Sequence, residues 1–386
     1  MIKTYTAYTT EVDDTNLAVS QILTQLKPEE NLLTNSIGII SCHSEFVLSG
    51  VVKALGEALP FDTVGAISTA QSTAGKSDAL ILSIMLITSD GVQFASAVTP
   101  SLTKNAAEEI DATYKKIATS FFARPRLVLA YAPFMTENSG DDYVEILARA
   151  SYGAPCFGTI ATDSSEAFEN CFSIYNGEHF RDKMVITLIY GNFKPKFFIA
   201  NISDDKILHK GAVITKSRGH ILMEVNNRPI ADFLNDMGLD KFGETRFAML
   251  SLPFLLDYHD GTPKVSKIFV SLTSERHALC AGAVPEGSTM HIAINEREDI
   301  LSTTGHAMDK ILEQSENVAG LLIYSCFSRS VSMGSDIFAE LELVNNKVSD
   351  LPTLMAYSGG EICPTTNIDD KSINRFHNNA FIACLF

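Results

Sequence analysis

The sequence is short of tryptophan, basic residues and long apolar runs. It has no Trp, and 30 Lys and Arg stand against 46 Asp and Glu, which gives a formal net charge of -16. An acidic surface of this kind repels phosphate backbones and anionic lipid, so we expect no nucleic acid and no membrane as partners. The longest apolar stretch, residues 79–87, is far shorter than the roughly 20 residues of a membrane-spanning helix. The first residues also lack an apolar signal core, so we expect a cytoplasmic protein.

Cysteine is present, but not in the spacings that mark disulfides or metal sites. There are seven cysteines, an odd number, and no CxxC pair occurs. This is typical of reduced thiols in a cytosol. The nine histidines are scattered without compact ligand spacing, so we expect no metal site.

One motif resembles a phosphate-binding loop, and the sequence excludes it. Gly75-Lys76-Ser77 matches the end of such a loop, but Ala70 stands where the first Gly is needed. A strand pattern follows in place of the required helix.

The sequence does contain a strand, helix, strand and hairpin pattern that recurs three times. In the first copy, a strand at residues 36–43 precedes a helix whose apolar residues, between 46 and 59, recur at three- and four-residue steps. A second strand follows at residues 63–69. The next two apolar runs, residues 79–88 and 92–98, are separated by Ser89-Asp90-Gly91, which predicts a hairpin turn between them.

The other two copies follow the same order. The second has a strand at residues 127–133, a helix at 141–150 that Ser139 or Asp141 caps, and a strand from residue 155. The third has a strand at 321–326, a helix through Ile337, Phe338, Leu341 and Val344, and a strand at 354–358. Ser335 and Asp336 are the predicted caps of that last helix.

These patterns predict an α/β protein of two domains, with mixed β-sheets and flanking helices. The segment around residues 192–216 reads as a linker through strand-like pieces, and a different strand–turn–helix segment follows it, with Pro229 beginning the helix and Gly238 ending it. We place the domain boundary near residues 200–215, with domains 1–210 and 211–386.

Several short stretches resemble the FIST family, whose members pair an N-terminal and a C-terminal FIST domain. They occur in the family's order, mainly across residues 220–386, and the N-terminal half is similar more loosely, at residues 39–42 and 64–68. Asn227 and Ala380 depart from the family's usual Gly and Thr. The stretches that carry the resemblance are Glu224-Val225-Asn226-Asn227-Arg228-Pro229, Gly282-Ala283-Val284-Pro285-Glu286-Gly287, Ser325-Cys326-Phe327-Ser328-Arg329, Gly359-Gly360-Glu361-Ile362-Cys363-Pro364 and His377-Asn378-Asn379-Ala380-Phe381.

The resemblance implies a sensory protein of signal transduction that binds a small ligand, an amino acid being the usual suggestion. Both FIST domains together fill the chain, so the resemblance also implies output through a separate signalling protein. Some members of the family resemble haem-binding nitric oxide sensors, and a haem-based nitric oxide sensor is therefore one alternative; otherwise we expect no cofactor.

The carboxyl ends of strands are where α/β sheets bind ligands, and this rule selects the candidate residues. They are polar or small side chains at predicted strand ends or in the turns that follow. The set is Cys42, Ser44, Ser68, Ser325, Cys326, Arg329, Glu361 and Asn378.

Two charged members of this set suit an amino acid. Arg329 can hold a carboxylate through two parallel donors, helped by the helix expected to begin near Ser335, and Glu361 can hold the ammonium group. The alternative is that Arg329 and Glu361 pair with each other and brace two loops. Asn378 and His377 can equally cap backbone groups.

Catalysis is the remaining alternative, through a cysteine acting on a small substrate. Cys42-His43 is the most enzyme-like pair, but neighbours on an extended strand point to opposite faces. Cys326 lies between a strand and a helix, yet no Gly-x-Cys-x-Gly turn surrounds it. We therefore expect binding and not catalysis.

Overall fold

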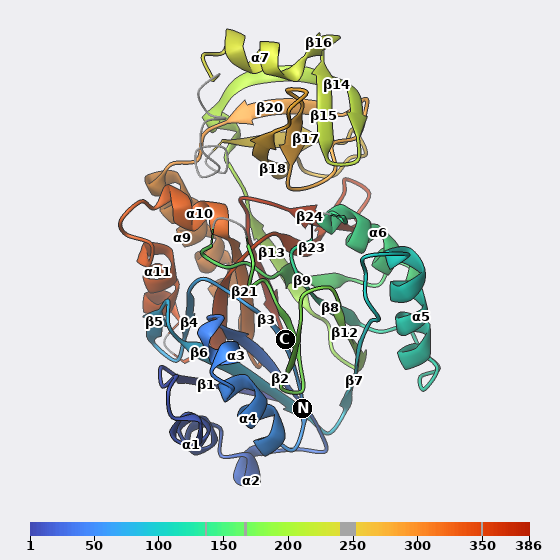
Figure 1. Cartoon of the computed structure of the whole chain (residues 1–386). Coiled ribbons are helices and arrows are strands. Elements are labelled where there is room, and N and C mark those ends of the chain that lie inside the picture. The colour runs from blue at the N-terminus through green and yellow to red at the C-terminus, as the bar shows by residue number, and fades with distance from the viewer. Residues whose placement is uncertain (136, 166–167, 240–251, 349) are drawn as a thin grey trace.

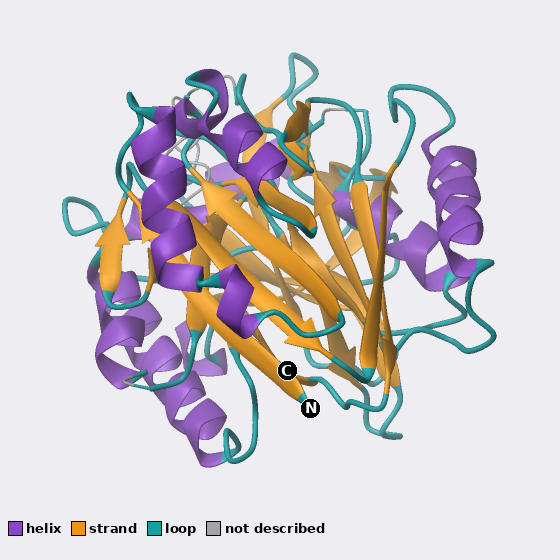
Figure 2. Ribbon diagram, turned by 90° about the horizontal axis from the view of Figure 1, so that it is seen from below, coloured by secondary structure: helices purple, strands orange, loops and turns teal. Residues whose placement is uncertain are grey.

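The computed structural model describes all residues except 136, 166–167, 240–251 and 349. It is an α/β structure with three mixed six-stranded sheets and a smaller barrel (Figure 1). The three sheets form a body, and helices lie outside its strands, as the view from below shows (Figure 2). The expected fold class is therefore confirmed.

The first sheet contains the first predicted repeat. At its centre, β2 and β3 run parallel, and β6 lies antiparallel to β2. The chain passes from β2 to β3 through two helices, α3 (Glu45–Leu48) and α4 (Val51–Ala58). The sequence predicted a single helix here, but Gly50, at φ 87°, interrupts it. In order, the strands are β1 (Ile2–Thr9), β6 (Leu82–Ser89), β2 (Asn35–Cys42), β3 (Asp62–Ile67), β10 (Ser173–Tyr175) and β11 (Glu178–Phe180).

The second sheet repeats this arrangement. Its parallel pair is β8 and β9, joined through α6 (Gly140–Ala150), and β12 lies antiparallel to β8. Ser139 caps α6 in a reciprocal capping box with Asp142, so of the two predicted caps Ser139 is the one used. The strand order is β7 (Val92–Val98), β12 (Val185–Gly191), β8 (Leu127–Ala132), β9 (Cys156–Ile160), β23 (Glu361–Thr366) and β24 (Ser372–His377).

The third sheet completes the set around the parallel pair β21 and β22. Here α10 (Phe327–Ser332) begins directly after β21, and α11 (Ala339–Lys347) follows. The expected caps Ser335 and Asp336 are wrong, because they lie in the turn between these helices and Phe338 precedes α11. The strand order is β13 (Lys196–Ala200), β25 (Phe381–Leu385), β21 (Leu321–Cys326), β22 (Thr353–Ser358), β4 (Gln71–Thr73) and β5 (Lys76–Asp78).

The predicted hairpin at Ser89-Asp90-Gly91 is also wrong. Strand β6 pairs on one side with β1 and on the other with β2, so both its edges are occupied. The chain therefore leaves the first sheet, and β7 pairs with β12 at the edge of the second.

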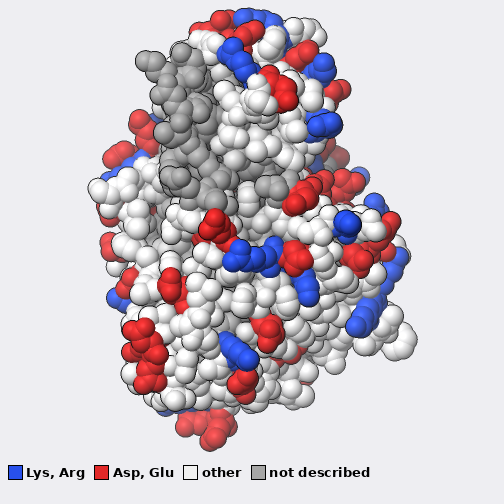
Figure 3. Space-filling model, in the orientation of Figure 1, with Lys and Arg blue, Asp and Glu red and all other residues white. Residues whose placement is uncertain are grey.

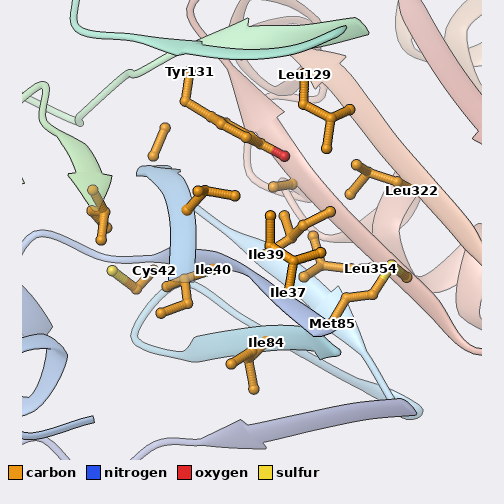
Figure 4. Close-up of a cluster of buried hydrophobic side chains, with 14 of the residues drawn as sticks. Ile37, Ile39, Ile40, Cys42, Ile84, Met85, Leu129, Tyr131, Leu322 and Leu354 are labelled. Carbon is orange, nitrogen blue, oxygen red and sulfur yellow. The ribbon is translucent and has the colours of Figure 1, made fainter. Parts of the chain in front are cut away.

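Strand alternation explains how each sheet buries both faces. On β8, Leu127, Leu129 and Tyr131 point into a core shared by the three sheets, whereas Val128 and Ala130 face the helices. Leu129, Tyr131, Leu322, Leu354 and Ile39 converge in this shared core (Figure 4). The outer faces are covered by α1 (Thr15–Leu26) and α4, by α5 (Ala106–Ala118) and α6, and by α9 (Arg297–Glu313) and α11.

The barrel is formed by residues 207–293, beyond the short 3-10 helix η1 (Asp204–Lys206), and lies above the body in Figure 1. Its sheet closes because β14 pairs with both β20 and β15. Its core is separate from the others and includes Phe254 and Phe269, and α7 (Ile230–Asp236) packs on it with Pro229 before its first residue. The strands are β14 (Ile207–Arg218), β20 (Thr289–Ala293), β17 (Pro253–Asp257), β18 (Val265–Leu272), β19 (Ala278–Cys280), β15 (Ile221–Val225) and β16 (Arg228–Pro229).

Candidate functional site

The ends of β8, β9, β21 and β22 meet the barrel, and a small cavity lies at this junction. Its volume is about 30 Å³, room for one or two water molecules. The body contributes polar and aromatic groups, and the barrel contributes apolar ones. The lining residues are Phe134, Thr162, Phe168, Ile268, Val270, Ala281, Cys326, Phe327, Ser328, Ser358 and Gly359.

A second cavity of similar volume adjoins the first. It also holds about 30 Å³ and shares Phe134, Ala281 and Gly359 with its neighbour. Phe134 packs against Phe168, with ring centroids 5.0 Å apart. Both cavities are thus bounded by the body and by the barrel, and Phe134 lies between them.

Glu361 lies just behind the wall of the first cavity, at the start of β23. It is fully buried, and among the described residues neither of its carboxylate oxygens has a hydrogen-bond partner. Burial raises its pKa well above the ordinary value, and the neighbouring Ser358 and Cys326, the backbone of Ala380 and the charge of Arg329 oppose this rise only in part. Burial therefore favours the neutral form of this carboxyl group.

Asn378 adds a second unpaired polar group to this region. Its side chain is buried, and neither the oxygen nor the nitrogen of its amide has a partner in the described part of the chain. Its backbone N–H donates to the carbonyl of Ser266 in the barrel, at 3.0 Å. A side chain at Gly360 would approach Nδ2 of Asn378 to 3.1 Å, so this amide lies beside the turn that leads to Glu361.

The next residue, Asn379, is fully hydrogen-bonded. Its Nδ2 donates to Oγ of Ser328 at 2.9 Å, and its Oδ1 accepts from Nδ2 of Asn295 at 2.5 Å. Ser328 Oγ in turn donates to Sγ of Cys326 at 3.2 Å. This chain of hydrogen bonds fixes the side chains on one wall of the cavity.

Arg329 is also buried here, but its partner is Glu340 on α11. Nε and Nη2 of Arg329 donate to Oε1 of Glu340 at 3.1 and 2.7 Å, and Nη2 also reaches Oγ1 of Thr304. The other Glu340 oxygen accepts from Oγ of Ser325 at 2.8 Å. Nε and Nη2 of Arg329 are thus occupied by a protein carboxylate, while Nη1 is buried without a hydrogen-bond partner among the described residues. The expected Arg329–Glu361 brace is absent from the ion pairs of the described residues.

Cys326 lines the cavity as a protonated thiol. Burial raises its pKa, and the charge of the nearby Glu361 adds to the rise, while Ser328 lowers it. A thiol in this state is a poor nucleophile.

The remaining predicted residues do not line the cavity. Cys42 ends β2 inside the apolar core of the body, and burial raises the pKa of its thiol. Ser44 precedes α3 without capping it through its side chain, and Ser68 donates to the carbonyl of Ala70 at 2.9 Å. The structure therefore brings together the predicted residues that belong to the third repeat. Ser325 is connected to this group only through its hydrogen bond to Glu340.

Sequence reasoning missed several lining residues. Thr162 and Ser358 follow or end the second parallel strand of their repeats, so the strand-end rule could have found them. Ile268 and Val270 carry no such signal, because they belong to an ordinary apolar strand of the barrel. Only the docking of the barrel makes them part of the site.

The described part of the chain also bears on metal binding and on membrane insertion. No group of three or more His, Cys, Asp or Glu side chains there could hold a metal ion. None of the helices described there combines the length and apolar character needed to cross a membrane.

Known families and structures provide an independent comparison. The family model of the FIST N domain matches residues 36–228, and that of the FIST C domain matches residues 231–364. No curated protein matches the chain.

Two solved structures are similar over their whole length. A cyanuric acid hydrolase from A. caulinodans is 9% identical with a TM-score of 0.44, covering 100% of this chain and 99% of that one. A chorismatase is 9% identical with a TM-score of 0.35, covering 100% and 99%. These values are too low to carry an argument about function.

Proposed function

The chain belongs to the FIST family, and on that premise we propose that it senses a small amine-bearing metabolite, such as an amino acid, in the cavity between body and barrel. FIST domains are small-ligand sensor domains of signal transduction. The proposal adds the place and the chemistry of binding, a cytoplasmic location and output through a separate protein.

The observation that carries the proposal is the unpaired carboxyl group of Glu361 behind the cavity wall. A buried carboxyl group without a partner costs free energy, and a ligand ammonium group would compensate for it through a charge-assisted hydrogen bond. The amide of Asn378 offers one donor and one acceptor more. In this proposal Glu361 and Asn378 contact the ligand, whereas Arg329 and Glu340 join α9, α10 and α11 to β21.

The small volume of the cavity supports a sensor. An amino acid is much larger than the water molecules that about 30 Å³ can hold. To admit it, the barrel residues Ile268 and Val270 or the aromatic residue Phe134 must move away from the body. Ligand binding would then be coupled to the position of the barrel, which is the change that a sensor must transmit.

We propose binding without catalysis and without haem. The one cysteine in the cavity wall, Cys326, is a protonated thiol, and the described lining of both cavities has no His that could serve as a base or as an axial ligand.

Thermal unfolding with a ligand panel tests the proposal. The panel contains the standard amino acids, simple amines and simple carboxylic acids. We expect at least one amino acid to stabilise the native protein, by about 2.7 kcal/mol at a concentration 100 times its Kd. Stabilisation by carboxylic acids alone, or by no member of the panel, contradicts the proposal.

Glu361→Gln is the informative variant, because it keeps the shape of the side chain and removes the carboxyl group that a ligand ammonium would meet. We expect it to fold and to lose at least about tenfold in ligand affinity. Glu342→Gln is the matched control, since Glu342 is exposed on α11. If Glu361→Gln responds to the ligand as the unmodified protein does, Glu361 is not the ligand contact.

A further inference from the structure

A broad open groove lies at the opposite ends of β8 and β9 from the cavity. Its volume is about 890 Å³, which is near the upper limit for small-molecule sites. Small-molecule sites enclose most of their ligand, however, whereas this groove is open to solvent. Segments from four parts of the chain form it. The lining residues are Arg124, Pro125, Arg126, Tyr152, Gly153, Ala154, Pro155, Asn192, Phe193, Lys194, Pro195, Phe197, Thr366 and Ser372.

The groove gathers positive charge on an acidic protein. Arg124, Arg126 and Lys194 are exposed, and none of them forms an ion pair with another described residue. Over the face drawn in Figure 3 as a whole, acidic and basic side chains are interspersed. With a net charge of -16 over the whole chain, three uncompensated cations along one groove form a local field that attracts anions.

Aromatic rings lie among these cations. Tyr152 is 75% exposed, and the guanidinium of Arg124 lies 5.4 Å from the centre of its ring. Tyr152 adopts a left-handed backbone conformation, φ 55°, which is costly for a bulky residue and places its ring at the rim. Phe193 and Phe197 continue the aromatic surface, and Phe197 stacks on Phe157 of the central core.

Three prolines border the groove, at positions 125, 155 and 195. Each fixes the backbone of its loop, so little entropy is lost when a partner orders the surface. Arg and Tyr are also the residue types that contribute most to binding at protein interfaces.

We propose that this groove binds an acidic, extended segment of a partner protein. The positive charge selects for carboxylates, the exposed rings favour apolar or aromatic side chains between them, and the open shape suits a chain better than an enclosed small molecule. This surface stands apart from the cavity, so the proposal does not depend on the ligand proposed above.

The position of the groove links it to the cavity. Arg126 directly precedes β8 and Pro155 directly precedes β9, whereas Phe134 and Thr162 follow the other ends of the same strands. A docked partner and a bound ligand would therefore contact opposite ends of two fully buried strands.

An array of short peptides tests the proposal with the full-length protein. The peptides form a series with an increasing number of Glu residues, and their other positions are Gly, Ser, Leu or Tyr. A matched control series has Lys in place of each Glu. We expect binding to increase with Glu content, to be stronger when Tyr is present, and to weaken at physiological salt. Equal binding of Glu and Lys peptides, or no binding of either, overturns the proposal.

Charge reversal locates the surface. The double variant Arg124→Glu/Arg126→Glu should weaken binding of the best Glu peptide by at least about tenfold. The control Lys53→Glu/Lys310→Glu changes net charge equally at exposed cations on α4 and α9, outside the groove, and should change affinity by less than about twofold. Equal losses in the two variants would show a general charge effect and overturn the proposal. Binding of ATP at this groove, with no peptide binding, would assign it to a small anion and overturn it as well.

Discussion

Buried ionisable side chains in this protein fall into two groups, those with an opposite charge beside them and those without. Arg329 and Glu340 are both fully buried and joined at 2.7 Å, and Lys267 is joined to Asp141 at 2.8 Å. Glu361 and His377 are equally buried but have no charged hydrogen-bond partner in the described chain. The paired groups stabilise the structure as long as both partners remain, and the unpaired ones make its stability depend on pH.

His377 gives a testable pH dependence. Burial lowers the pKa of its imidazole to about 3, while Nε2 lies 3.1 Å from the carbonyl oxygen of Cys363 and Nδ1 has no partner in the described residues. In the unfolded chain this imidazole becomes protonated near pH 6.5, whereas in the folded protein it stays neutral at that pH. Stability should therefore fall as the pH drops from about 6.5 towards 3, by at most about 1.4 kcal/mol per pH unit from this group.

The measurement is urea unfolding between pH 7 and pH 4.5. His377→Gln removes the titrating group, so its stability should vary less with pH than that of the unmodified protein. The exposed His306→Gln is the control and should keep the original slope. Glu361 acts in the opposite direction, because its raised pKa makes stability increase as the pH falls. The difference between the unmodified protein and His377→Gln isolates the histidine; equal slopes would contradict the prediction.

At the scale of elements, the three repeats exchange their hairpins in a cycle. The hairpin β4–β5 follows β3 of the first sheet but pairs with β22 of the third. The hairpin β10–β11 follows β9 and pairs with β3, and β23–β24 follows β22 and pairs with β9. Each sheet is therefore completed by its neighbour, and no repeat buries its own strand edges alone.

Two glycines mark equivalent positions in this cycle. Gly65 of β3 lies opposite Ile40, and Gly158 of β9 lies opposite Ala130. A Cβ atom added to Gly65 would lie 1.8 Å from the carbonyl oxygen of Ile40, and one added to Gly158 would lie 1.9 Å from that of Ala130. The third repeat has Ala356 at the same register, opposite Tyr324.

We expect Gly65→Ala and Gly158→Ala each to lower the free energy of unfolding by about 3 kcal/mol or more, because the parallel pair must move apart. Ala356→Gly, the reverse change at the third position, should cost only about 1 kcal/mol. Chemical denaturation of the purified variants measures both. Equal and small losses at all three positions would show that the strands adjust to a methyl group.

At the scale of the whole molecule, charged contacts hold the barrel on the body. Lys267 of β18 is fully buried and donates to Asp141 of α6 and to the carbonyl of Phe376 in β24. Asp141 also accepts from the backbone N–H of Ala283 at 2.7 Å. Burial acts to lower the pKa of Lys267, but the charges of Asp141 and Tyr258 and the hydrogen bonds with both together more than offset it, so the pKa is raised. A more exposed pair, Arg375 and Asp260, joins the same two parts.

Asp141→Asn should loosen the barrel. It leaves the ammonium group of Lys267 buried without its counter-charge, at a cost of about 3 kcal/mol or more. We expect faster proteolysis in the connection between β13 and β14 and a lower denaturation midpoint. Asp260→Asn breaks the more exposed pair and should cost about 1 kcal/mol or less. Similar losses in the two variants would mean that Lys267 is not the principal attachment.

The barrel also spans the place where the two family models meet, since residues 207–293 include the end of one match at 228 and the start of the next at 231. The second and third sheets likewise take strands from both halves of the chain. Similarity along the sequence and compactness in space therefore divide this protein differently.

The sequence by itself determined the class of fold, the threefold strand–helix–strand pattern and the family. These follow from local signals, because a strand buried on both faces, such as β8 or β21, is a continuous apolar run, and a cap such as Ser139 acts within one helical turn. Only the tertiary structure decided that β7 leaves the first sheet, that Arg329 binds Glu340 and that Ile268 reaches the cavity. Each of these depends on contacts between segments far apart in the chain, and neither residue type nor spacing specifies which of several chemically suitable partners will lie within reach.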